Sequence, residues 1–402
     1  MKQFVKFFLR VVTRVGVIPC LYILSPFVIL KLGILYNQRI GHIAINTEMV
    51  MRRLRLIPPA RRTIILAGVF DPANETLVRM YSRVFRIFVS RQYVRYLFAV
   101  SDIFENTPFW ETFPWRPEQH TRENFTILNT SEPILSFTAD EMRRGAELLR
   151  QMDIGKDDWY ACIHAREQSY FSKWRPELAE HWGKVKFRNI EIDAFEKAAH
   201  RITESGGNAI RVGALTDRVL GGRDETRMID YAGKFRSDFG DVYLLSHCRF
   251  FLCSNSGLNM VSTIFNRPIG IANAIPLNSY PFHTYDLFIP GFVVSKENGE
   301  PVPFPVLQDM GFFAGGANLL TYSERLHAEG LKPVGNSAED IDDLCADLLE
   351  IANGNSFCVN AVEEQDAYHA KYFDFLEPGT QVGKISPRFL YKYRHLIFPD
   401  TC

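Results

Sequence analysis

The sequence predicts an α/β protein of two domains, each built on a parallel sheet with crossover helices. At 402 residues, the chain exceeds the size that one hydrophobic core usually supports. Strand-like apolar runs alternate with helix-like runs over residues 40–100 and again over residues 159–272, as expected for βαβ units. An irregular stretch rich in aromatic residues and proline, residues 101–136, separates the two series.

Composition narrows the functional classes. Lys+Arg and Asp+Glu both number 46, so the net charge gives no support for a nucleic-acid partner, and an anion site must be local. The seven cysteines are scattered and form no CxxC pair, which argues against a zinc site and a disulfide framework and favours a reducing compartment. The chain lacks GxGxxG after its first predicted strand and lacks GxxxxGK[ST], GxSxG and HExxH, the signatures of dinucleotide, P-loop, serine-hydrolase and zinc-protease sites.

Residues 1–38 predict an amphipathic, hydrophobic segment that associates with a membrane. Four cations recur at intervals of four residues beside aromatic and aliphatic side chains: Lys2, Lys6, Arg10 and Arg14. Residues 15–35 are apolar apart from Ser25 and Lys31, long enough to span a bilayer. Interrupting prolines favour a monotopic surface anchor, while a spanning anchor and a buried first helix stay open. No small-residue cleavage site supports a signal peptide.

In the first βα series, we expect strands at 40–45, 63–70 and 86–89, with a first helix capped by Thr47 and a second by Asn74. This series and the aromatic stretch form an expected amino-terminal Rossmann-like domain, residues 39–136. The aromatic stretch is either a loop held by aromatic burial or a wall on which a sugar stacks.

The second series defines an expected carboxyl-terminal Rossmann-like domain, residues 137–360. We expect a helix capped by Thr138 and strands that begin at Trp159, Ala209, Arg249 and Ile269. The tail, residues 361–402, is expected to pack back on the amino-terminal domain.

Two strand ends in the second domain carry the principal candidate site. One strand ends on His164-Ala165-Arg166, and a later one leads into a loop formed by Ser254, Asn255, Ser256 and Gly257. Ligands of open parallel sheets bind outside the carboxyl ends of strands. The forked guanidinium of Arg166 suits phosphate, and a helix start after the loop would present unpaired amide groups. Together these ends predict one pocket for a diphosphate, although the loop could also be an ordinary helix cap.

Further candidates are less specific. Arg211 ends a third strand before Gly213 and could contact the ligand or pair with Asp230 or Asp241 inside the domain. His164 could orient Arg166, contact the ligand or cap its strand. The basic, aromatic loop from Arg166 to Arg188 is either a lid or a solvated surface loop. In the amino-terminal domain we consider three residues as general base: His42, Glu48 and Asp71.

The ordered set of motifs resembles a bacterial glycosyltransferase family of surface-polysaccharide synthesis with the GT-B fold. The motifs are His164-Ala165-Arg166, Arg188-Asn189, Asp230-Tyr231-Ala232, Ser237 to Asp241, Ser254 to Leu258, the strand after Pro268, the Arg39 to Glu48 segment and Gly383 to Pro387. The His-x-Arg element is further similar to that of O-fucosyltransferases, where an arginine contacts the donor diphosphate without a metal. The resemblance implies that Arg166 contacts the donor diphosphate here; the candidate donor-binding set is Arg166, Arg211, Gly213, Asp241 and the loop from Ser254 to Gly257.

The resemblance implies two Rossmann-like domains facing across a cleft, with the donor on the carboxyl-terminal domain. We expect a metal-independent hexosyl- or deoxyhexosyltransferase that uses a nucleotide-diphosphate-sugar, needs no cofactor, and acts on a glycan or lipid-linked acceptor. We expect it in the cytoplasm, peripheral or monotopic on the inner face of the membrane, with no nucleic-acid partner. Two alternatives stay open: a GT-B sugar-nucleotide 2-epimerase, and a non-catalytic sugar-nucleotide-binding subunit of a polysaccharide assembly complex.

Overall fold

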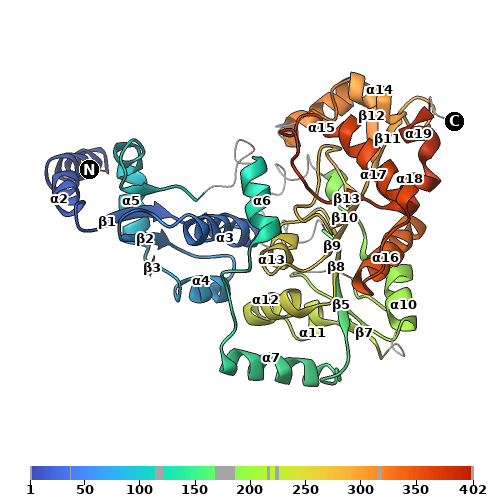
Figure 1. Ribbon diagram of the computed structural model, residues 1–402, viewed down its shortest axis with the longest axis horizontal. Helices are drawn as coiled ribbons and strands as arrows, with labels where there is room; N and C mark the ends of the chain where they lie inside the picture. Colours follow the sequence, from blue (N-terminus) through green and yellow to red (C-terminus); the bar gives the residue numbers. More distant parts are fainter. Residues whose placement is uncertain are drawn as a thin grey trace. The chain divides into compact units, whose positions relative to one another are not determined.

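The computed structural model describes residues 2–36, 38–113, 121–167, 186–214, 218–221, 226–314 and 319–399. The chain divides into two compact units. The first unit comprises Met1–Arg116 and Ser131–Ser136, and the second comprises Pro117–Thr130 and Phe137–Cys402. Each unit contains its own parallel sheet, which confirms the predicted mixed α/β class (Figure 1).

The first unit is a four-stranded parallel sheet in the order β3-β2-β1-β4. Its strands are β1 (Ile29–Ile34), β2 (Thr63–Val69), β3 (Arg86–Val89) and β4 (Trp110–Glu111). Its helices are α1 (Lys2–Val12), the π-helical turn η1 (Thr13–Val17), α2 (Ile18–Leu24), α3 (Ile40–Leu56), α4 (Glu75–Tyr81) and α5 (Arg91–Phe104).

The predicted strand at 40–45 is wrong, because these residues open helix α3. The first strand is instead β1, which lies inside the apolar run 15–35, so the expected domain start at residue 39 is also wrong. Lys31 sits in this strand and donates to Glu111 Oε2 of β4 at 2.7 Å. A short apolar run does not distinguish a strand from a buried helix, and α3 is buried along most of its length. Thr47 accordingly lies within α3 instead of capping it.

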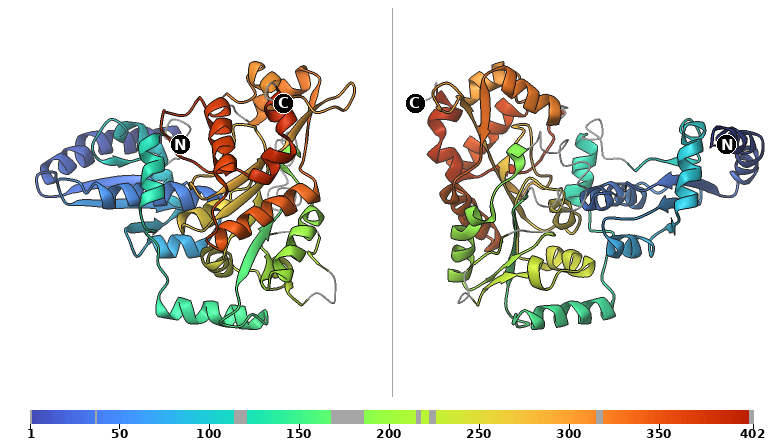
Figure 2. Two further views of the ribbon diagram at one scale, coloured as in Figure 1. Left: turned by 45° about the vertical axis from the view of Figure 1, so that its right-hand side comes forward. Right: turned by 180° about the vertical axis from the view of Figure 1, so that it is seen from behind.

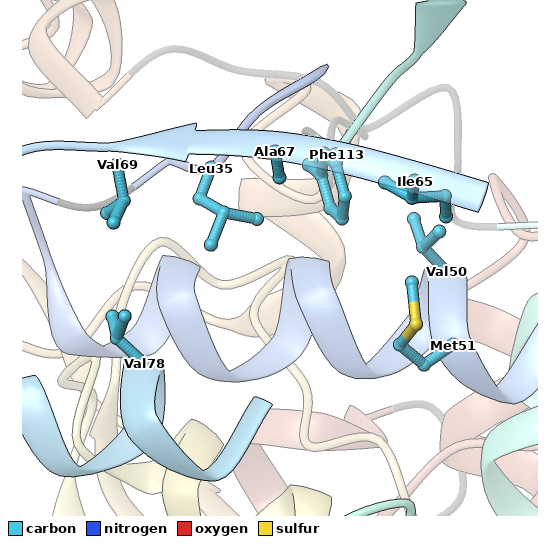
Figure 3. Packing of buried hydrophobic residues seen from close by; sticks show 8 residues of the cluster. All are labelled: Leu35, Val50, Met51, Ile65, Ala67, Val69, Val78 and Phe113. Atoms are coloured by element: carbon cyan, nitrogen blue, oxygen red, sulfur yellow. The ribbon is translucent and has the colours of Figure 1, made fainter. Parts of the chain in front are cut away.

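One hydrophobic cluster of the first unit lies between β2 and α3, and another lies between the sheet and α5. Figure 3 shows Ile65, Ala67 and Val69 of β2 pointing toward the helices, with Ile65 near Val50 of α3 and Val69 above Val78 of α4. Alternate residues of a strand share one face, which gives β2 its apolar inner surface. Asn74 caps α4 as predicted, with its Oδ1 accepting from the Leu77 N–H at 2.9 Å.

Within the described residues, the second unit is built on a seven-stranded parallel sheet in the order β13-β10-β9-β8-β5-β6-β7. The strands are β5 (Tyr160–His164), β6 (Asn208–Arg211), β7 (Met228–Asp230), β8 (Phe251–Ser254), β9 (Ile269–Ala274), β10 (Leu287–Pro290) and β13 (Lys384–Ile385). Six of them, from β7 to β10, follow the 3-2-1-4-5-6 order of a doubly wound Rossmann sheet. A small antiparallel pair joins β11 (Phe292–Ser295) to β12 (Leu331–Val334).

Helices cover this sheet (Figures 1 and 2). The crossover helix α10 packs on β6 and against α16, which contacts β9 and β10, while α13 packs on β8 and β9 and against α12. Within the described ranges, the helical segments of the second unit are α6 (Arg122–Thr130), α7 (Ala139–Gln151), η4 (Lys186–Arg188), η5 (Ile192–Phe195), α10 (Glu196–Glu204), α11 (Tyr231–Lys234), α12 (Asp238–His247), α13 (Asn259–Ile264), α14 (Phe304–Asp309), α15 (Leu319–Ala328), α16 (Ala338–Ala352), α17 (Val359–Tyr372), α18 (Pro387–Lys392) and α19 (Arg394–Ile397). Thr138 caps α7 in a capping box with Glu141.

The carboxyl-terminal tail belongs to the second unit, so the expectation that residues 361–402 pack on the amino-terminal domain is wrong. Strand β13 pairs with β10 at the edge of the large sheet, Leu287 opposite Lys384. Gln365 of α17 donates to the Ile385 carbonyl at 2.6 Å, and the Ser386 hydroxyl donates to Asp347 of α16 at 2.6 Å. The tail therefore completes the large sheet and its helical cover.

Candidate functional site

The strand order of the second unit creates a topological switch point between β5 and β8. From β5 the chain builds β6 and β7 on one side, and then returns to build β8, β9 and β10 on the other. The connections that leave the carboxyl ends of β5 and β8 therefore diverge, which is where open α/β sheets bind their ligands. His164 stands opposite Cys253 in the sheet, so the two predicted strand ends are immediate neighbours.

A direct contact joins these two strand ends. The backbone N–H of Arg166 donates to Ser254 Oγ at 2.8 Å, and Ser254 is fully buried. The Arg166 guanidinium, which is half-buried, donates through Nη1 to Asn189 Oδ1. The Asn189 amide oxygen orients the guanidinium, which positions the charge of Arg166 at the switch point. The structure therefore brings together the two motifs that the sequence singled out.

A second arginine reaches the same place, and our sequence reasoning did not assign it to the site. Arg188 of η4 donates through Nη2 to the Asn255 carbonyl at 2.8 Å and to Asn255 Oδ1 at 3.2 Å. The neighbouring Phe187 carbonyl accepts from Asn273 Nδ2 at 3.2 Å, at the end of β9. Segment 187–189 thus crosses the ends of β5, β8 and β9 and carries Arg188 onto the loop after β8. The Arg188-Asn189 pair within the basic loop was the available sequence signal.

The loop from Ser254 to Gly257 does not lead directly into a helix as we expected. Helix α13 begins only at Asn259 and is six residues long, so its dipole is a weak source of positive potential. Gly257 is exposed, Asn255 is half-buried, and Ser256 Oγ accepts from the Leu258 N–H at 3.4 Å. The loop contributes hydroxyl and amide groups close to Arg188, and the two arginines supply the charge.

Arg211 has a different position from the predicted ligand contact. Its side chain is 1% exposed and donates through Nη2 to Glu167 Oε1 at 2.6 Å, while Nη1 lies 3.6 Å from Asp230 Oδ1. The alternative of an internal ion pair with Asp230 is therefore observed. Arg211 binds Glu167, the residue after Arg166, and so helps to fix the position of the strand end that carries Arg166. Gly213 follows at φ +143°, a conformation that favours glycine.

Asp241 is also buried inside the second unit, where a nucleotide-sugar cannot contact it. It is buried in α12, accepts from the Tyr231 hydroxyl at 3.0 Å and pairs with Arg236 at 3.0 Å. Burial raises the pKa of this carboxyl to about 6, while Arg236 and Tyr231 lower it. Asp241 therefore holds the α11–α12 turn together, and the prediction that it contacts the nucleotide-sugar is corrected.

His164 is held as a neutral imidazole between two arginines. Burial lowers its pKa to about 4, the bond to the Val212 carbonyl raises it, and the charges of Arg211 and Arg166 lower it further. Nδ1 lies 3.1 Å from the Val212 carbonyl, which can only accept, so Nδ1 carries the proton and Nε2 is left as an acceptor. In this arrangement His164 can orient the strand end through Nδ1, and it can also accept a proton at Nε2.

We expect His164 to make the protein sensitive to acid. The unfolded chain binds the proton near pH 6.5 and the folded chain only near pH 4, so the unfolded state binds more protons between these values and stability falls as the pH falls. From pH 7 to pH 5 this loss is about 2 kcal/mol. The His164→Asn variant can still donate to the Val212 carbonyl but does not titrate. Its free energy of unfolding in urea should therefore fall from pH 7 to pH 5 by about 2 kcal/mol less than that of the wild type. Equal losses in the variant and the wild type would contradict this assignment.

The general-base candidates of the first unit separate clearly. His42 lies in the first turn of α3, which follows β1, and Asp71 follows β2, so both stand at the carboxyl edge of adjacent strands. Burial first, and then the charge of Arg39, lower the pKa of His42, so it is neutral at pH 7. Asp71 is exposed, with φ +51°.

Glu48, the third candidate, has a structural role, and the prediction that it acts as a base is corrected. Its side chain is completely buried and pairs with Arg52 Nε at 2.8 Å. It also accepts from the Ile134 N–H at 2.7 Å and from the Tyr81 hydroxyl at 3.1 Å. These contacts join α3 and α4 to segment 131–136 inside the first unit, and leave the carboxylate no access to solvent.

Two predictions lie wholly or partly outside what the structure describes or tests. Most of the predicted lid, residues 168–185, falls outside the described residues, as does Trp115 of the aromatic stretch. Within the described ranges, no group of three His, Cys, Asp or Glu side chains is placed to hold a metal ion. Independence from metal stays a prediction.

Comparison with known proteins gives distant structural likenesses. No protein-family model matches the sequence, and no curated protein matches it. A family 9 glycosyltransferase from Veillonella parvula shares 13% identity over 80% of this chain and 97% of its own, with a TM-score of 0.46. The ADP-heptose lipopolysaccharide heptosyltransferase II of E. coli shares 12% identity over 74% of this chain and 98% of its own, with a TM-score of 0.40. The iron-containing dodecameric glycosyltransferase TibC of enterotoxigenic E. coli shares 12% identity over 63% of each chain, with a TM-score of 0.35. We draw no functional argument from likenesses at this level, and the proposal below depends on the residues of the site.

Proposed function

We propose that the protein is a glycosyltransferase that uses a nucleotide-diphosphate-sugar, with the donor bound by the second unit. The observation that carries this proposal is the convergence of Arg166 and Arg188 at the switch point of a Rossmann-ordered sheet. Forked guanidinium groups are the side chains best matched to phosphate oxygens. The switch point of such sheets is the usual place of nucleotide ligands.

The proposed reaction follows from where charge develops. The oxygen of an acceptor hydroxyl attacks the anomeric carbon, its proton passes to a general base, and the bond from that carbon to the diphosphate breaks. The diphosphate leaves with an added negative charge, which Arg166 and Arg188 would stabilise without a metal ion. We assign the acceptor to the first unit, whose His42 and Asp71 are the accessible base candidates.

The sugar and acceptor classes are part of the proposal. The resemblance to enzymes of surface-polysaccharide synthesis supports transfer of a hexose or deoxyhexose to a glycan or lipid-linked acceptor. The choice between inversion and retention depends on the geometry of the bound substrates.

A panel of nucleotide-diphosphate-sugars tests the proposal by thermal shift. One of them, supplied at about 100 times its Kd, stabilises the folded protein by about 2.7 kcal/mol, which should raise Tm by about 3–5 °C. The same nucleoside as its monophosphate should give a much smaller shift, because the diphosphate makes the arginine contacts. No shift with any diphosphate would contradict the proposal.

Product analysis with the stabilising donor then separates three functions. Transfer to an added acceptor supports a transferase, whereas conversion of the sugar without any acceptor would indicate a 2-epimerase. Binding without turnover across a panel of glycan and lipid-linked acceptors would indicate a non-catalytic binding subunit.

A further inference from the structure

The amino-terminal helix, Lys2–Leu24, is fixed along one side to the first unit. Leu9, Val17 and Leu21 pack on a cluster that includes Leu97 of α5 and Leu32 of β1. Polar contacts reinforce this side: Arg10 forms a two-point ion pair with Asp102 at 2.6 and 2.7 Å, and Thr13 Oγ1 lies 3.1 Å from the Tyr96 hydroxyl. The contacts run over most of the helix length, so the helix lies along α5.

The π-helical turn η1 explains how this side stays aligned. The attached residues recur every four positions, at 9, 13, 17 and 21, and an α-helix turns about 40° too far at each such step. A π-helical turn takes more residues per turn, so Thr13–Val17 cancels much of that drift. The opposite face of the helix is consequently also continuous.

That opposite face is apolar and exposed over its whole length. Phe4, Val15 and Ile23 are each 73% exposed. The other large exposed apolar residues of the helix are Val5, Phe7, Phe8, Val11, Val12, Tyr22 and Leu24, and Phe27 lies in the turn that follows. The helix from Gln3 to Leu24 is also long and apolar enough to cross a membrane, judged by length and composition alone. An exposed apolar face of this extent indicates a surface that binds a membrane or another protein molecule.

The charged residues of the amino-terminal helix indicate what binds its apolar face. The first acidic residue of the chain is Glu48, whereas Lys2, Lys6, Arg10 and Arg14 all precede it on the helix. Lys6 and Arg14 are both exposed. At about 100° per residue Arg14 lies beside the apolar face, whereas Lys6 lies on the side of Arg10, where its charge acts on Asp102. A second copy of this chain would bring like charges together, while an anionic lipid surface complements them.

We propose that the Lys2–Leu24 helix lies in the plane of an anionic bilayer surface, with its apolar face in the lipid, Arg14 at the phosphate groups, and Lys6 close enough for its charge to attract the anionic surface. A spanning arrangement conflicts with the contacts, because α5 runs beside the helix and would carry Arg95 and Asp102, both exposed, into the hydrocarbon. The proposal is independent of the function proposed for the second unit.

Depth measurement along the helix tests the orientation. The starting protein has Cys20, Cys358 and Cys402 replaced by serine, and single cysteines are introduced by Phe4→Cys, Val15→Cys or Ile23→Cys. Each is labelled with an environment-sensitive fluorophore and mixed with phosphatidylglycerol vesicles that contain quenchers at known depths. All three labels should lie at one shallow depth, about 5–10 Å into the interface. A matched label from Val359→Cys, which replaces an exposed residue of α17, should not respond to vesicles.

Other outcomes overturn the proposal. A depth that changes steadily by about 28 Å from position 4 to position 23, with position 15 near the bilayer centre, would show a spanning helix. Labels that report an apolar environment without vesicles, together with a doubled mass in sedimentation, would show a second copy as the partner. Labels that never respond to vesicles would show that no lipid covers the face.

The cations provide an independent test. The double variant Lys6→Gln with Arg14→Gln should bind the anionic vesicles about 20- to 30-fold more weakly, since each cation near such a surface contributes about fivefold. The matched double variant Lys156→Gln with Lys332→Gln removes two exposed cations of the second unit and should bind as the wild type does. Equal losses in the two double variants, or no loss in the first, would contradict the role of the helix cations.

Discussion

Arg166→Ala is expected to lower sugar transfer by about 10²- to 10³-fold, the effect of removing one preorganised donor from a developing anion. The variant keeps the backbone bond from residue 166 to Ser254 Oγ, so the two strand ends should stay joined. It loses only the guanidinium that Asn189 orients. The loss should fall on kcat and kcat/KM together if the contact strengthens as the diphosphate leaves. Initial rates with the stabilising donor measure this directly.

A second arginine of the same unit provides the control for this experiment. Arg227 is exposed and precedes β7, so it lies at the amino-terminal edge of the sheet, the edge opposite the switch point. It donates to the Gly206 carbonyl at 2.8 Å. Arg227→Ala should retain wild-type transfer, and circular dichroism should show both variants folded. Wild-type turnover in Arg166→Ala would remove the assignment of Arg166 to the leaving diphosphate.

Glu48→Ala is expected to destabilise the first unit by about 3–5 kcal/mol, because it leaves the buried charge of Arg52 without its carboxylate. It also removes the acceptor of the Ile134 N–H and the Tyr81 hydroxyl, which together tie segment 131–136 and α4 to α3. Burial raises the pKa of Glu48, while Arg52 and these hydrogen bonds lower it. Urea unfolding followed by circular dichroism measures the loss.

A compensated variant distinguishes structure from chemistry at this position. Glu48→Leu with Arg52→Met removes both buried charges and should recover much of the lost stability, since apolar groups of similar volume replace buried ion pairs at little cost. If the double variant is stable and transfers sugar, Glu48 has no chemical role. A stable Glu48→Ala protein without transfer would restore Glu48 as a candidate base.

Much of the large sheet could be predicted because its strands are short, fully buried and separated by turn residues. The strands that begin at Tyr160, Asn208, Phe251 and Ile269 are apolar runs whose two faces are both covered. Strand β13 has only two residues, and nothing in its own sequence indicates that it pairs with β10. The tail was therefore placed with the wrong domain.

The first unit shows where local pattern fails. Residues 15–35 and 40–45 are both apolar, yet β1 forms in the first run and α3 in the second. What decides between them is that β1 pairs with both β2 and β4, contacts that lie dozens of residues away in the sequence. The same error obscured that His42 follows β1 and stands at the carboxyl edge of its sheet.

The sequence predicted those site residues that directly follow a buried strand. It did not predict a site residue that another segment of the chain brings to the strand ends. His164-Ala165-Arg166 could be identified because the polar residues follow a buried strand directly. Arg188 reaches Asn255 only because η4 crosses the ends of three strands, an arrangement that no spacing in the sequence indicates. Arg211 was a candidate because it ends a strand, and Asp241 because it belongs to the Ser237 to Asp241 motif. Both are buried in internal ion pairs, so they hold the unit together.

The most direct test is a crystal structure of the full-length protein with the nucleotide-diphosphate-sugar that gives the largest thermal shift. We predict the diphosphate at the carboxyl ends of β5 and β8, with its oxygens at about 3 Å from the guanidinium groups of Arg166 and Arg188 and beside Ser256. A diphosphate bound elsewhere, with Arg166 still held only by residues of the protein, would contradict the proposed donor site.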